Sequence, residues 1–127
     1  MATTQKAGFI SLTAGGTIAA FRCVEASTSA DLTCTLANAD TDSCLGINQD
    51  AVTVGQACTI GMSGILKVEC TASTITAGAL VTVDGAGGGI KTAVSGDKGI
   101  GVALVAFAAN EIGEILFVPN LTGALIA

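Results

Sequence analysis

The residues of this chain best suited to chemistry are its five cysteines, which are spaced 10 to 14 residues apart. The sequence has no histidine and no CxxC pair, so we do not expect a zinc site. A nucleophilic cysteine needs a neighbouring base or cation, and the commonest one, histidine, is absent. Most of the cysteines alternate with apolar residues, which predicts buried thiols, with one or two disulfides as the alternative. The five residues are Cys23, Cys34, Cys44, Cys58 and Cys70.

Two further patterns come close to known chemical motifs without completing them. The segment Gly85–Thr92 approaches the phosphate-binding pattern GxxxxGK[ST], but Ile90 stands where the second glycine is required and no helix pattern follows. We therefore expect a hairpin loop there. Asp40 and Asp42 lack the distal glutamate of a calcium loop. We predict no catalytic residue, no cofactor and no metal ion; a hydrolase using paired carboxylates is the remaining enzyme alternative.

The composition excludes several other classes of protein. The chain has 127 residues, of which 50% are hydrophobic and 12% charged, which predicts one folded domain rather than a disordered chain. A net charge of -5 and the absence of Trp and Tyr argue against nucleic-acid binding. The longest uncharged runs, 7–21 and 51–66, are too short and too often interrupted for a membrane helix. A surface with so little charge favours cover by partners.

Period-2 alternation of apolar residues predicts short, half-buried strands. One example is the segment 32–36, whose alternation places Leu32, Cys34 and Leu36 on one face. Clusters of glycine with Ser, Asp or Lys mark turns between such segments. The segment 103–111 is the single candidate for a helical turn. We therefore predict an all-β fold. The alternating segments are 32–36, 58–62, 66–70, 90–94 and 114–117.

An internal sequence repeat with a period of 55 to 57 residues divides the chain into two similar halves, about 17–70 and 74–118. Two such units are expected to close one small β-barrel or β-sandwich. Three pairs of segments carry the repeat: Thr17–Val24 with Thr74–Val81, Leu45–Ile47 with Ile100–Val102, and Gln56–Ile60 with Glu111–Ile115.

Two apolar ends lie outside this repeat, an N-terminal arm over residues 1–16 and a C-terminal tail over residues 119–127. Chain ends usually fray unless something holds them. Apolar ends are therefore expected either to contact a partner or to add strands to the same domain. The candidate partner-interface residues are Phe9, Ile10 and Leu12 in the arm and Leu121, Leu125 and Ile126 in the tail.

Three segments of the second half carry a resemblance to a known family: Ile75–Asp84, Gly99–Leu104 and Asn110–Val118. Together they resemble the pattern of small capsid decoration (cement) proteins of tailed bacteriophages. The first half follows this pattern more loosely, since 18–24 lacks the glycine and 31–43 is a longer, cysteine-bearing excursion. The resemblance implies a non-enzymatic virion protein on the outer capsid surface, made in the host cytoplasm. It also implies a homotrimer, the major capsid protein as partner, and no contact with nucleic acid or membrane.

We therefore predict a cement protein that stabilises contacts between major capsid subunits. The alternative is a β-rich binding module of a fibre or surface layer that recognises a host-surface glycan or protein. The absence of Trp and Tyr argues against the glycan reading, since sugar sites usually contain aromatic platforms.

Overall fold

A computed structural model describes residues 8–37, 44–71, 74–85, 88–94 and 97–118. These residues form ten β-strands, β1 to β10, so the all-β prediction is confirmed. The helical turn considered at 103–111 is not formed. In its place, Phe107 and Ile75 form an isolated antiparallel bridge, with N–H···O distances of 2.8 and 3.0 Å.

The first five strands, residues 9–61, form the N-terminal half, a closed barrel with strand order β1-β3-β2-β4-β5. β1 pairs along its length with β5 in antiparallel register, and its end pairs in parallel with β3, which closes the barrel. The strands are β1 (Phe9–Ala14), β2 (Arg22–Ala26), β3 (Thr33–Leu36), β4 (Gly46–Asn48) and β5 (Ala57–Gly61).

The last five strands, residues 64–117, form the C-terminal half, a sheet with strand order β6-β10-β9-β7-β8. Among the described residues, its two edges meet at one parallel bridge, between Cys70 and Ile90, and most of β6 has no strand partner on that side. The strands are β6 (Gly64–Glu69), β7 (Leu80–Val83), β8 (Ile90–Thr92), β9 (Gly101–Ala103) and β10 (Ile112–Phe117).

The internal repeat predicted from the sequence is present in the strand pairing. β1 to β5 pair with one another in the same order and direction as β6 to β10, the β6–β8 contact being reduced to one bridge. The registers agree, since Val24 pairs with Gly46 as Val81 pairs with Gly101. One difference from expectation is that each half forms its own five-stranded unit. This follows from β1 and β6, which pair with the last strand of their own half.

The loops repeat as well, down to their backbone conformation. Gln56 Oε1 accepts the N–H of Thr53 at 2.8 Å, and Glu111 Oε1 accepts the N–H of Ala108 at the same distance. Left-handed backbone also recurs, since Phe21 (φ 64°) occupies the position of Gly78 (φ 85°). This is the place where the first half lacks the glycine. A non-glycine residue in this conformation costs about 1–2 kcal/mol, so neighbouring contacts must hold Phe21 there.

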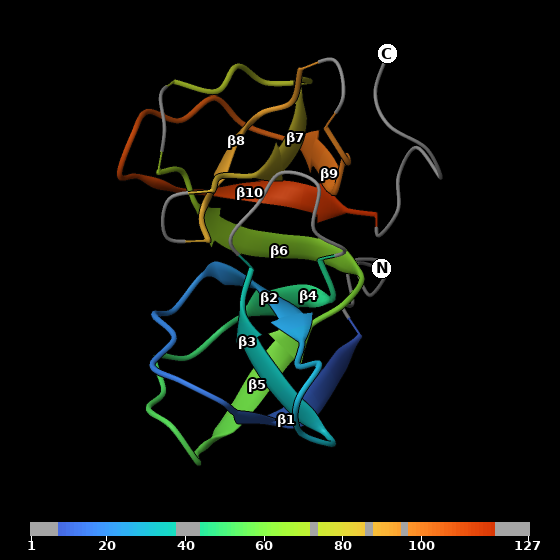
Figure 1. Ribbon diagram of the computed structural model, residues 1–127. Coiled ribbons are helices and arrows are strands. Elements are labelled where there is room, and N and C mark those ends of the chain that lie inside the picture. The colour runs from blue at the N-terminus through green and yellow to red at the C-terminus, as the bar shows by residue number, and fades with distance from the viewer. Residues whose placement is uncertain (1–7, 38–43, 72–73, 86–87, 95–96, 119–127) are drawn as a thin grey trace, which may run out of the picture.

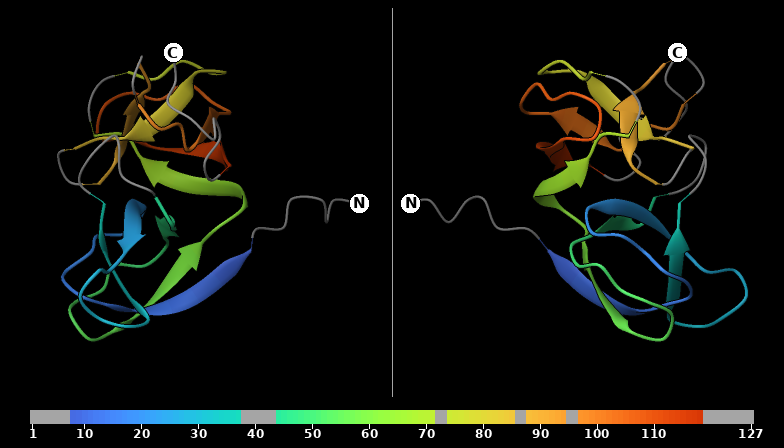
Figure 2. Two further views of the ribbon diagram at one scale, coloured as in Figure 1. Left: turned by 45° about the vertical axis from the view of Figure 1, so that its right-hand side comes forward. Right: turned by 90° about the vertical axis from the view of Figure 1, so that its left-hand side faces the viewer.

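The two halves stack one on the other, with β6 lying across the junction (Figure 1). Both turned views in Figure 2 show the same stacking. A small core fills the barrel and includes Ile18, Val24 and Ile60. A larger core fills the C-terminal half and continues across the junction to four buried residues of the barrel, Cys23, Ala37, Cys44 and Ile47. The hydrophobic effect therefore joins the halves into one folded unit.

Candidate partner interface

Of the six candidate interface residues, the structure describes three, all on β1. Phe9 is 51% exposed, Ile10 is 38% exposed and Leu12 is half-buried. β1 is a strand of the barrel, so residues 9–14 of the expected arm belong to this sheet, and residues 1–7 lie outside the described residues. The other three candidates, Leu121, Leu125 and Ile126, also lie outside the described residues.

The alternation along β1 separates these side chains onto two faces. Ile10, Leu12 and the buried Ala14 face the barrel interior, and Phe9 faces outward opposite Gly61 of β5. Ile10 stays partly exposed although it faces inward, because β3 pairs with β1 only from Thr13 onward. The barrel is therefore open at the end where β1 begins.

An apolar depression of about 430 Å³, the barrel-end hollow, lies at this opening. Ile10 and Leu12 line one side and Leu45 and Leu32 contribute further apolar surface; the remaining lining residues are Ala26, Ser27, Ala30, Asp31 and Thr33. Leu32 is 80% exposed and has a φ of 51°. The expectation that Leu32 shares the buried face of Cys34 is wrong, because this residue precedes β3 in left-handed backbone and turns outward.

A second apolar surface, the C-terminal outer face, was not predicted from the sequence. It is a row of four side chains that pair with one another across four adjacent strands. Leu116 and Leu80 are 40% and 39% exposed, and the other two are half-buried. A signal was present in the alternation of β10, where Leu116 stands between buried Ile115 and Phe117. The row, in order across the sheet, is Ile65, Leu116, Val102 and Leu80.

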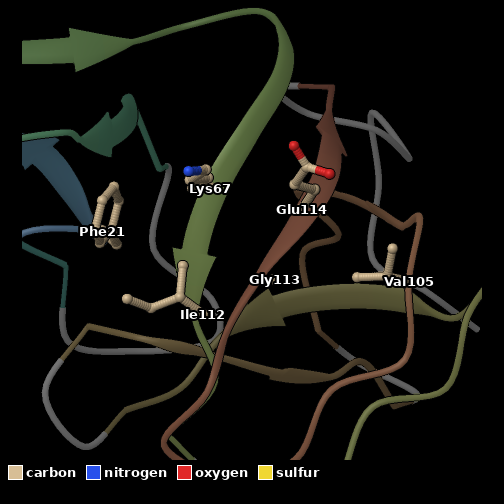
Figure 3. Close-up of a pocket in the computed structure, with 6 residues that line it drawn as sticks. All are labelled: Phe21, Lys67, Val105, Ile112, Gly113 and Glu114. Carbon is tan, nitrogen blue, oxygen red and sulfur yellow. The ribbon is translucent and has the colours of Figure 1, made fainter.

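A second hollow, of about 490 Å³, lies where the halves meet (Figure 3). Phe21 reaches it from the barrel, and Lys67 and Glu114 from neighbouring positions on β6 and β10. Its other lining residues are Val105, Ile112 and Gly113. Its lining is mainly apolar, with one positive and one negative side chain.

An ion pair between Arg22 and Glu69 joins the halves beside this hollow. An Arg22 guanidinium nitrogen lies 3.2 Å from Glu69 Oε1, and both side chains are about four-fifths buried. The main chain reinforces this contact, since the N–H of Glu69 donates to the carbonyl of Phe21 at 3.0 Å. The left-handed conformation of Phe21 is thereby tied to the inter-half contact.

All five cysteines are buried free thiols, which confirms the prediction of buried thiols; the alternation in the sequence had indicated this for all but Cys44. Cys34 Sγ donates to Cys58 Sγ at 3.4 Å inside the barrel core, and burial followed by this hydrogen bond raises the pKa of Cys34 to about 12. The hydrogen bond with the Cys44 thiol, followed by burial, raises the pKa of Cys23 well above 9.0. These thiols therefore stay protonated at neutral pH and act as small apolar side chains.

The described residues contain no group of three or more His, Cys, Asp or Glu side chains that could hold a metal ion. Within the same part of the chain, no helix is long and apolar enough to cross a membrane. The segment that approached a phosphate loop contributes β8, paired in antiparallel register with β7 as a hairpin.

A family model described as phage cement protein matches residues 3–117. This span includes all ten strands and therefore both repeats. No curated protein sequence matches the chain. Among solved structures, the fold is similar to "The crystal structure of head fiber gp8.5 N base in bacteriophage phi29", with a TM-score of 0.73. That match has 14% sequence identity and covers 96% of this chain and 99% of the other.

Proposed function

Because the chain belongs to the phage cement protein family, we propose that it binds the major capsid protein and holds neighbouring capsid subunits together. Its place is the outer surface of the virion head, and its role is head decoration. The observation that carries this proposal is the family match over residues 3–117, which spans both halves of the fold. The role we infer is structural and includes no reaction.

A decoration protein stabilises the shell by mass action, because a ligand that binds only the assembled state shifts the equilibrium toward assembly. Broad apolar contacts suit this task better than a deep pocket. Exposed large apolar side chains on both halves support it, among them Phe9, Leu32, Leu80 and Leu116. Many copies bound around one shell add their contributions.

We assign the capsid contact to the N-terminal segment up to Phe9, together with the apolar tail that carries Leu121, Leu125 and Ile126. Phe9 supports this assignment because it faces outward at the very start of β1, where the chain leaves the barrel. Self-association as a homotrimer completes the proposal.

The test is co-sedimentation of the purified protein with expanded capsids that lack decoration. A variant that begins at Gly8 keeps β1 intact, whereas deletion of residues 1–16 would remove a barrel strand and confuse binding with folding. We expect saturable binding of the full chain and at least tenfold weaker binding of the shortened one. Val54→Ser, on an exposed turn at the opposite end of β1 from Phe9, is the control that should bind normally. Failure of the full chain to bind would refute capsid decoration, and undiminished binding by the shortened chain would refute the assignment to the arm.

A further inference from the structure

The two halves contact each other through different faces, although they share one fold. The barrel contributes an outer row of Cys23, Ile47 and Gly61, which pair across β2, β4 and β5. All three residues are buried, and Cys23 and Ile47 belong to the core of the C-terminal half. The C-terminal half contributes its open edge between β6 and β8. The contact is therefore head to tail, an outer face against an open edge.

The backbone shows how this open edge is filled. In the barrel, the N–H of Thr13 donates to the carbonyl of Leu32 at 3.0 Å and closes β1 onto β3. The equivalent groups in the C-terminal half are the N–H of Glu69 and the carbonyl of Gly88. Both bond instead to the barrel segment 21–23, whose first carbonyl accepts from Glu69 at 3.0 Å and whose last N–H donates to Gly88 at 2.7 Å. The barrel thus inserts a segment into the opening of the C-terminal half.

Among the residues that the structure describes, none covers the second copy of either surface. The equivalents of Cys23, Ile47 and Gly61 are Leu80, Val102 and Leu116 of the C-terminal outer face. On the barrel, the equivalents of the open-edge residues line the barrel-end hollow, with Ile10 and Leu12 in the places of buried Leu66 and Val68. Both uncovered surfaces are apolar.

We propose that the C-terminal outer face of one copy docks over the barrel-end hollow of a second copy of this chain, repeating the internal contact between molecules. The occupant is a second copy because the two uncovered surfaces are the repeat equivalents of two surfaces that already bind each other within the chain. Since each copy carries one of each surface, the contact is heterologous, and such contacts close into a ring when the rotation between copies allows it.

The side chains at equivalent positions fit this arrangement. Gly88 has a φ of 79°, and a Cβ there would lie 2.6 Å from Leu36 Cδ1, so the internal junction requires glycine. The equivalent residue in the hollow is Leu32, which keeps the left-handed φ but carries a large, exposed side chain. Because Thr13 and Leu32 already bond to each other, a second copy cannot insert its main chain there. Leu80, Leu116 and Leu32 are larger than their equivalents Cys23, Gly61 and Gly88. We therefore expect side chains, rather than an inserted main chain, to fill the contact between copies.

This inference names the two surfaces through which the proposed self-association occurs. It rests on the proposed function only for the number of copies in the assembly. The test is sedimentation equilibrium of the purified full chain without capsids, across a range of protein concentrations. The two test variants are Leu32→Asn in the hollow and Leu116→Glu on the outer face. Asn tolerates left-handed backbone, and Leu116 lies on a solvent-facing side of β10, so both variants should keep the fold. Val54→Asn is the matched control.

We expect the wild type and Val54→Asn to self-associate, and each test variant to do so at least roughly tenfold more weakly, as the loss of one buried leucine side chain implies. An equimolar mixture of the two test variants should form a heterodimer, because one intact hollow and one intact outer face remain between them. The control shows that removing an exposed apolar side chain elsewhere is harmless.

The proposal is overturned if the wild type is monomeric at every concentration, if either variant associates like the wild type, or if the mixture stays monomeric. Normal association of Leu32→Asn combined with lost capsid binding would assign the hollow to the capsid instead. Capsid binding is measured separately, by co-sedimentation. If the protein failed to bind capsids, the result of sedimentation equilibrium for self-association would still be valid.

Discussion

The junction between the halves yields the sharpest quantitative prediction, through Gly88. Substitution to Ala would place a Cβ 2.6 Å from Leu36 Cδ1, 2.8 Å from Leu36 Cγ and 3.2 Å from the carbonyl of Ala37, all in the opposite half. It would also put a non-glycine residue at a φ of 79°. The carbonyl of Gly88 accepts the inter-half hydrogen bond from Cys23, so any shift that relieves the overlap strains this bond.

A matched control separates the two causes of the expected loss of stability, which are backbone strain and overlap with the opposite half. Gly55 has a similar φ of 87°, but a Cβ there meets nothing within 4 Å, so Gly55→Ala reports backbone strain alone, about 1–2 kcal/mol. Gly88→Ala adds overpacking of about 1–3 kcal/mol and a weakened hydrogen bond of about 1 kcal/mol. We expect the free energy of unfolding to fall by about 3 kcal/mol or more for Gly88→Ala.

The assay is urea unfolding followed by far-ultraviolet circular dichroism, because the chain has no Trp or Tyr for fluorescence. The informative quantity is the difference between the two variants, in which the backbone strain cancels. If Gly88→Ala lowers the free energy of unfolding no more than Gly55→Ala does, the halves do not meet as closely as described. The internal contact would then no longer support the proposed docking between copies.

Three further predictions concern the buried thiols and the ion pair. All five cysteines should resist Ellman's reagent at pH 8 in the folded protein and react in 6 M guanidinium; rapid reaction of one or more native thiols would contradict their burial. Because the pKa of Cys34 is raised from 9.0 to about 12, the folded state holds its proton more tightly than the unfolded state. The stability that this thiol contributes should be complete below about pH 9 and should be lost as the pH rises toward 12. In urea unfolding measured at several pH values, the free energy of unfolding of Cys34→Ala should therefore fall less steeply above pH 9 than that of the wild type. An equally steep fall would refute the link between Cys34 and alkaline stability. Arg22→Met should lower the free energy of unfolding by about 1–3 kcal/mol, because it removes the ion-pair partner of a Glu69 carboxylate that is about four-fifths buried; an unchanged free energy of unfolding would show that the pair does not support the junction.

The sequence predicted the strands because their periodicity is local. Alternation placed Cys58, Ile60 and Val68 inward, as the structure has them, since a strand with one buried face needs period 2. The internal repeat could also be predicted from the sequence, because equivalent segments of the two halves carry similar residues. The structure confirms the equivalence, since Gly46 pairs with Val24 as Gly101 pairs with Val81.

The unpredicted features depend on contacts between distant segments. Leu32 continues the alternation of β3, yet the chain turns left-handed there, which pattern alone does not reveal. Phe21 is held in a glycine-type conformation beside Glu69, 48 residues further along. The C-terminal outer face was missed because Leu80, Val102 and Leu116 come together only through sheet pairing. The expected arm likewise extends into the barrel, because β1 pairs with β5 over residues 9–13.

The barrel closes with its own strands, whereas the C-terminal half remains an open sheet, and this difference implies an order of folding along the chain. Every strand pairing of the barrel lies between residues 9 and 61, so a ribosome that has released this stretch has released a unit complete in its sheet hydrogen bonding. The C-terminal half needs segment 21–23 to fill its open edge. Domains generally fold as they emerge, N-terminal parts first. We therefore expect the barrel to fold first and then to supply segment 21–23, to which the open edge of the C-terminal half bonds as that half folds.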